Sequence, residues 1–295
     1  MSPASTPVNR PWLRTDVPAV VALALLSVIG GLSFLWPFAL GPDAALADAS
    51  LAPWIFAAIL PLILVLVAAQ LSRDGLDSRS VAMLGVLAAV GAALRPLGAG
   101  IGGLEPLWIV LIIGGRVLGP AFGFALGSLT MFASALLTGG VGPWLPFQMV
   151  AAGWLAMGAG MLPPLRGRRE VLMLAGYGVV AAIAFGFCMN LWFWPWAQSV
   201  SPQVAFEPGA AVAVNLHHWI AFNLTTSLGW DLTRAAVTAV GVLLLGGAAL
   251  AALRRVIRTA QFVPAGVPAP VERSSRPPEP ASHPEPIGIA LEPRP

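Results

Sequence analysis

The sequence has 295 residues, of which 57% are hydrophobic and only 10% charged, and its mean hydropathy is +0.82. This composition argues against a soluble globular protein and supplies enough apolar residues for about eight membrane spans of ~20 residues. The sequence has 16 arginines and no lysine, which excludes a P-loop lysine, and the single cysteine excludes an intramolecular disulfide. The isoelectric point near 10.4 accompanies a net charge of only +3, which indicates a membrane protein with basic ends rather than a nucleic-acid-binding protein.

Hydropathy predicts an all-α integral membrane protein of about eight transmembrane helices. The first stretch ends in Trp36 and Pro37, is long for a signal peptide and is followed by another apolar stretch, so we expect it to stay in the mature chain. The fourth is short, and short spans bounded by Gly or Pro often border a cavity. The expected helices cover residues 17–40, 52–71, 81–99, 105–118, 120–138, 147–165, 171–194 and 227–252.

Arginine occurs on alternate connections between these stretches, which predicts that those connections, and both termini, are cytoplasmic in the cell membrane. The intervening connections 41–51, 139–146 and 195–217 contain no arginine. Residues 1–16 form an N-terminal cytoplasmic segment, and the Pro-rich stretch 259–295 predicts a disordered cytoplasmic tail. The arginines that support this topology are Arg10, Arg14, Arg73, Arg79, Arg116, Arg166, Arg168, Arg169, Arg254, Arg255 and Arg258.

Polar residues in or beside the expected helices fall toward the outer half of the membrane, together with most of the tryptophans. Polar groups are costly in lipid, so they should face a cavity or each other. The tryptophans predict either an aromatic belt at the membrane interface or the walls of a pocket for a large, partly apolar molecule. Our candidate substrate-binding residues are Arg95, Glu105, Trp144, Gln148, Asn190, Trp194, His218 and Asp231.

Structural explanations stay open for several of these residues. Arg95 could extend to the interface or pair with Glu105, and Asp231 could form an internal ion pair with Arg234, three residues along the same helix. Adjacent histidines on a helix point in different directions, so His217 and His218 do not make a good metal site. We predict no metal, no cofactor and no catalytic group, since the chain has no recognisable catalytic motif.

The expected helix 81–99 carries two rows of small residues, which would let another helix approach closely. Packing within the chain is the alternative interpretation. One row is Ala88 and Ala92, and the other is Gly85, Ala89 and Ala93.

The stretch 115–149, GRVLGPAFGFALGSLTMFASALLTGGVGPWLPFQM, resembles the substrate-binding S component of energy-coupling factor (ECF) vitamin transporters. Residues 153–154 (GW), 158–163 (GAGMLP) and 227–234 (SLGWDLTR) extend the resemblance, which covers about residues 80–258. S components have a six-helix core, which corresponds here to 80–258. The two helices expected within 17–79 are additional to that pattern.

The resemblance implies a protein that captures a vitamin or related micronutrient outside the cell and delivers it with partner proteins. Those partners are a transmembrane coupling subunit and two cytoplasmic ATPases. The family docks the coupling subunit through small residues that match Ala88 and Ala92, with Gly85, Ala89 and Ala93 alongside. The GGVGPWLPFQ loop is most similar to S components linked to cobalamin or a similar tetrapyrrole, with riboflavin, thiamine-type and queuosine-type precursors as alternatives. A self-sufficient secondary transporter and, third, a membrane enzyme are the other functions to test.

Overall fold

The computed structural model describes residues 17–39, 78–98, 102–197 and 200–261, and within these ranges every regular element is helical. The expected helix 52–71, the N-terminal segment 1–16 and residues 262–295 of the expected tail lie outside the described residues, while residues 259–261 of that tail belong to the last helix. Contacts divide the chain into a unit of Met1–Ala260 and a unit of Gln261–Pro295. The helices described here belong to the first unit, except that the last one ends with Gln261.

The first helices follow the expected positions closely. Helix α1 spans Val17–Ala39, and helix α3 spans Ser78–Leu94. Helix α3 is followed by a 3₁₀ turn, η2 (Arg95–Gly98), and then by the short helix α4 (Leu107–Leu118). Helix α5 (Pro120–Thr138) has proline in its first turn, where the missing N–H is harmless, and Gly139 ends it in the left-handed conformation at φ 67°.

The second half contains one helix that begins within an expected connection. Helix α6 (Leu145–Met161) and α7 (Arg168–Phe193) occupy expected positions, and α7 continues into the 3₁₀ turn η3 (Trp194–Trp196). Within the expected outer loop 195–217, the chain instead begins helix α8 (Val212–Phe222). A π-helical segment, η4 (Asn223–Ser227), joins it to α9 (Leu228–Gln261).

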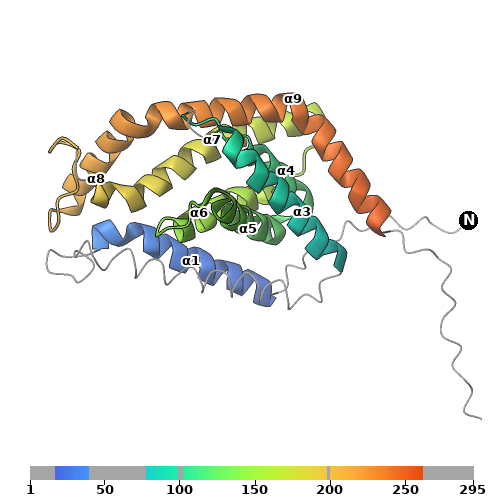
Figure 1. Ribbon diagram of the computed structural model, residues 1–295, viewed down its shortest axis with the longest axis horizontal. Helices are drawn as coiled ribbons and strands as arrows, with labels where there is room; N and C mark the ends of the chain where they lie inside the picture. The colour runs from blue at the N-terminus through green and yellow to red at the C-terminus, as the bar shows by residue number, and fades with distance from the viewer. Residues whose placement is uncertain (1–16, 40–77, 99–101, 198–199, 262–295) are drawn as a thin grey trace, which may run out of the picture. The chain divides into compact units, whose positions relative to one another are not determined.

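Within the part of the chain that the structure describes, four stretches are long and apolar enough to cross a membrane, which indicates an integral membrane protein. They are Ser80–Gly98, Pro120–Thr138, Arg168–Trp196 and Val212–Thr259, and the shorter apolar helices are Leu23–Phe38 and Leu107–Leu118. Helices α4, α5 and α6 form the packed centre, between α1 on one side and α9 on the other (Figure 1).

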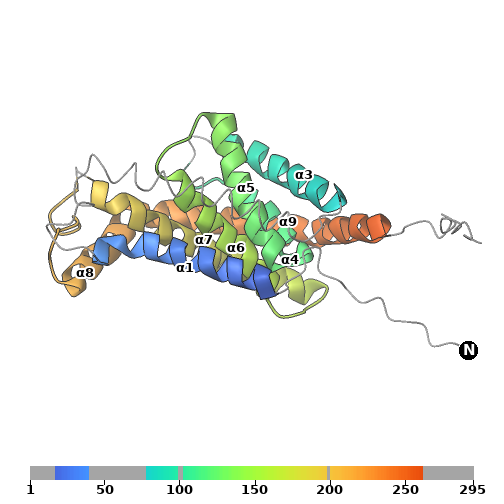
Figure 2. The same cartoon turned by 90° about the horizontal axis from the view of Figure 1, so that it is seen from below.

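Glycine allows the close approach of α5 to α6. A β-carbon at Gly123 would lie 2.6 Å from the Ala156 carbonyl oxygen, and one at Gly127 would overlap the Ala152 carbonyl. Glycines four residues apart thus form the contact face of α5, as in other membrane helix pairs. The same two helices run alongside each other in the view from below (Figure 2).

Candidate functional site

A cluster of ion pairs and hydrogen bonds links the arginine-rich ends of four helices. Glu170, at the start of α7 and only 1% exposed, accepts from Arg116 of α4 at 2.7 Å and from Arg254 of α9 at 2.7 and 3.0 Å. Arg116 also donates to the carbonyl oxygens of Leu162 and Pro163, at 2.7 and 2.9 Å, which follow α6. These contacts place arginine-bearing connections at one end of the bundle, as their alternation along the sequence predicts.

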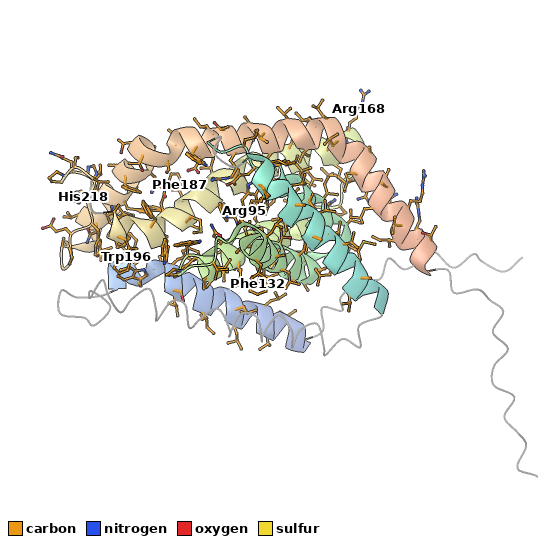
Figure 3. The ribbon with its side chains drawn as sticks, in the orientation of Figure 1. Arg95, Phe132, Arg168, Phe187, Trp196 and His218 are labelled. Carbon is orange, nitrogen blue, oxygen red and sulfur yellow. The ribbon has the colours of Figure 1, made fainter. Side chains whose placement is uncertain are left out.

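The opposite end holds aromatic side chains from α1, α6 and the residue before it, the end of α7, η3, the loop that follows it and α8, which we call the aromatic wall. Trp36 stacks on Trp196 with ring centroids 5.5 Å apart, and Phe38 contacts Trp194 and Trp219. Figure 3 shows Trp196 and His218 toward this end and Arg168 away from it. The aromatic wall comprises Phe34, Trp36, Phe38, Trp144, Phe147, Trp192, Trp194, Trp196, Phe206 and Trp219.

Helix α1 is an integral part of this wall. Phe34 packs edge-on against Phe147 of α6 at 5.0 Å, and the Trp154 indole donates to Ser27 at 3.0 Å. From the sequence, this helix is expected to be additional to the six-helix pattern. Its aromatic residues nevertheless complete the wall that α6, α7 and α8 begin.

Four polar atoms of the wall and of α6 are shielded from solvent and have no hydrogen-bond partner among the described residues. They are the indole N–H groups of Trp192, Trp196 and Trp219 and the Oε1 atom of Gln148. An unpaired buried donor or acceptor typically costs about 1–3 kcal/mol. A ligand that supplies the missing hydrogen bonds would remove this cost.

A charged cluster lies between α4, α7 and α9. Arg234 donates to Asp231 at 2.6 Å and to Glu105 at 2.8 Å, and Glu105 also accepts from the Trp108 indole at 2.7 Å. Asp231 and Arg234 are 1% and 6% exposed, and the guanidinium carbon of Arg234 lies 5.3 Å from the centroid of the Phe185 ring. The expected ion pair of Asp231 with Arg234 is therefore present, and it extends to a second carboxylate.

The π-helical segment η4 continues this polar region toward the aromatic wall. The Asn190 amide donates to Asn223 at 2.8 Å and to Ser227 at 2.6 Å, and Asn223 in turn donates to the Trp219 carbonyl. A π-helical turn is rare within α-helices and frequently occurs at functional sites. No pattern in residues 223–227 predicted this turn.

Several of the candidate substrate-binding residues form hydrogen bonds or ion pairs within the chain. Arg95 donates to Ser134 at 2.8 Å, and Glu105 pairs with Arg234, so the alternative pair of Arg95 with Glu105 does not form. Trp194 is fully buried and its indole donates to the Val204 carbonyl, while Nδ1 of His218 lies 2.9 Å from the Ala205 carbonyl. The last two contacts fasten the loop after η3.

The remaining candidates lie at the edge of the aromatic wall or on α3. Trp144 is 38% exposed, donates to the Gly140 carbonyl at 3.1 Å and contacts Trp192. On α3, Ala88 and Ala92 are buried against the chain's own helices. The other row is exposed and consists of Gly85, Ala89 and Ala93.

Among the described residues, no group of three or more His, Cys, Asp or Glu side chains could hold a metal ion. No protein-family profile matches the chain, and neither a curated protein nor a solved structure matches it.

Proposed function

We propose that this chain is the substrate-binding S component of an ECF-type importer and binds a vitamin or related micronutrient at its aromatic wall. The observation that carries the proposal is the group of shielded, unpaired polar atoms on Gln148, Trp192, Trp196 and Trp219. Aromatic surface with a few hydrogen-bonding groups is the usual lining of a site for an organic molecule. A large ligand such as a cobalamin-like tetrapyrrole has both the planar surface and the polar substituents for this wall.

The proposal includes the membrane topology and the partners. Two N-terminal spans and a six-helix core would cross the cell membrane with both termini in the cytoplasm, so that the aromatic wall faces outside. A transmembrane coupling subunit would dock on the exposed row Gly85, Ala89 and Ala93 of α3. Two cytoplasmic ATPases would supply the energy, since the sequence lacks a lysine-containing phosphate-binding loop.

The direct test is to identify the small molecule that stays bound to the protein during purification. The full chain is purified in mild detergent, and released small molecules are identified by mass spectrometry, followed by titration with cobalamin, riboflavin and thiamine. We expect one of these classes to bind, to quench tryptophan fluorescence and to bind more weakly to Trp196→Phe, which removes an unpaired indole N–H. Absence of any bound or titrating small molecule would contradict the proposal.

A secondary transporter is the second candidate, and the charged cluster is the observation that favours it. Ionisable groups buried within membrane helices often mark ion or proton pathways, and Asp231 and Arg234 are such groups on α9, with Glu105 paired to Arg234 from the loop before α4. Proteoliposomes that contain only this chain separate the two functions. A secondary transporter accumulates substrate under an ion or proton gradient, and Asp231→Asn abolishes this uptake. An S component alone binds substrate and gives no gradient-driven accumulation.

A further inference from the structure

A cavity of about 460 Å³ lies between α7 and α9, at the arginine-rich end of the bundle and away from the aromatic wall. It combines charged groups with a long aliphatic surface. The residues that define its chemistry are Gly167, Arg168, Leu172, Leu244, Gly247 and Arg254.

The aliphatic walls of this cavity open onto the outside of the helix pair. Leu172 of α7 is 62% exposed and Leu244 of α9 is 76% exposed, and both lie on helices long and apolar enough to cross a membrane. Gly247 adds space, because a β-carbon built there meets no atom within 4 Å. This surface suits a hydrocarbon chain rather than a water-soluble molecule.

The charged end carries more positive than negative charge. Glu170 is the acidic residue that lines the cavity, and it is already paired with Arg116 and Arg254. Arg254 keeps 40% of its side chain exposed. Among the described residues, Arg168 forms no ion pair, and its side chain extends away from the bundle in Figure 3.

The backbone adds to this positive charge. Helix α7 begins directly after Gly167, and no side chain caps its first turn, so free N–H groups lie beside the two arginines. An anion at this position would meet two guanidinium groups and the positive end of a long helix. The cavity thus pairs an anion-binding end with a hydrocarbon-binding wall.

We propose that this cavity binds one phospholipid with an anionic headgroup, its phosphate between Arg168 and Arg254 and one acyl chain against Leu172 and Leu244. The proposal does not depend on the proposed transport function, because the cavity lies at the end opposite the aromatic wall. Free phosphate shares the anionic chemistry but makes no use of the aliphatic walls. Anionic lipids are concentrated in the cytoplasmic leaflet, which faces this end in the expected topology.

Native mass spectrometry of the full chain in detergent tests the proposal. The protein is titrated separately with dioleoyl phosphatidylglycerol, dioleoyl phosphatidylcholine and inorganic phosphate. We expect one tightly held phosphatidylglycerol, with phosphatidylcholine at least about fivefold weaker, and no competition by millimolar phosphate. Equal binding of both lipids would overturn the proposal and mean non-selective lipid contact, and binding of phosphate alone would replace it with a simple anion site.

Matched variants locate the bound lipid. Arg168→Gln should weaken phosphatidylglycerol binding about fivefold, whereas Arg255→Gln removes the same charge from an exposed position that does not line the cavity and should have little effect. Gly247→Phe fills the cavity, and Gly176→Phe places the same ring in open space on α7. Retention of selective phosphatidylglycerol binding by folded Arg168→Gln and Gly247→Phe proteins would overturn the assignment to this cavity.

Discussion

The carboxylate of Asp231 lies directly against the backbone of Gly186, so that a β-carbon at position 186 would overlap it. The absence of a side chain on α7 thus lets α9 bring its acidic group between the two helices. Asp231 is buried there with Arg234, which reaches Glu105 beside α4. One glycine therefore sets the position of the charged cluster.

Gly186→Ala should separate α7 from α9 and lower the free energy of unfolding by about 1–3 kcal/mol, because an inserted methyl group overpacks this contact. Gly176→Ala is the matched control, since its β-carbon meets no atom within 4 Å on the same helix. Thermal unfolding of both variants in one detergent measures the difference. A melting temperature of Gly186→Ala equal to that of Gly176→Ala would show that α9 does not approach α7 here.

Gln148→Met should weaken ligand binding by roughly five- to tenfold and leave the unliganded protein equally or more stable. The substitution keeps the length of the side chain but removes an acceptor that is buried without a partner. Ligand titration and thermal unfolding are measured on the same preparation. Gln203→Met, on an exposed loop residue, controls for the change in side-chain chemistry. A loss of stability with unchanged affinity would place Gln148 in the packing of α6 and outside the ligand site.

Glu170→Gln should destabilise the protein by about 3–5 kcal/mol, because it leaves the buried Arg116 guanidinium without its counter-charge. The comparison is Glu207→Gln, which removes a carboxylate from an exposed loop. Denaturant titrations that follow tryptophan fluorescence give both free energies. If the two variants unfold at the same denaturant concentration, the cluster at this end contributes nothing to stability.

The lengths of the apolar stretches, and the Pro and Gly residues that bound them, made most helices of the core predictable. Pro120 and Gly139 bound α5 at the expected residues, and α4 is as short as its sequence indicates. Helix α8 was missed because the preceding residues are polar and Gly/Pro-rich and its own apolar stretch is brief. The end of α9 extends past the expected boundary because Arg254, Arg255 and Arg258 end the apolar stretch but are themselves good helix formers.

The candidate site was predictable by residue type but not by role. Buried Asp231 and Arg234 pair as their three-residue spacing indicates. Nothing local could show that Glu105 joins them or that Trp194 uses its indole on the Val204 carbonyl, since both contacts depend on how distant segments pack. The direction in which each small-residue row of α3 faces likewise depends on the position of α5.

Cysteine labelling should show that the two ends of the bundle lie on opposite sides of the membrane. In a Cys188→Ala background, Gly140→Cys should react with a membrane-impermeant maleimide on intact cells, and Pro164→Cys should react only after the membrane is opened. Position 164 is preferable to Gly167, whose φ of 61° disfavours a side chain. Labelling of Pro164→Cys from outside would invert the topology and place the aromatic wall in the cytoplasm.

The exposed row of α3, formed by Gly85, Ala89 and Ala93, is the proposed docking face for the coupling subunit. Ala89→Leu should abolish uptake in cells that contain the transporter's partners, because bulk on this face prevents close approach of another helix. Ligand binding by the isolated variant should stay normal, since position 89 is exposed and away from the chain's own contacts.

Ala88→Leu provides the internal comparison, one residue away on the same helix. Ala88 is 5% exposed, so a leucine there overpacks the interior, and we expect a loss of about 1–3 kcal/mol in stability together with weaker uptake. Uptake assays, ligand titration and thermal unfolding of both variants distinguish docking from packing. If Ala89→Leu transports normally while the isolated protein binds its ligand, the coupling subunit does not dock on this row of α3.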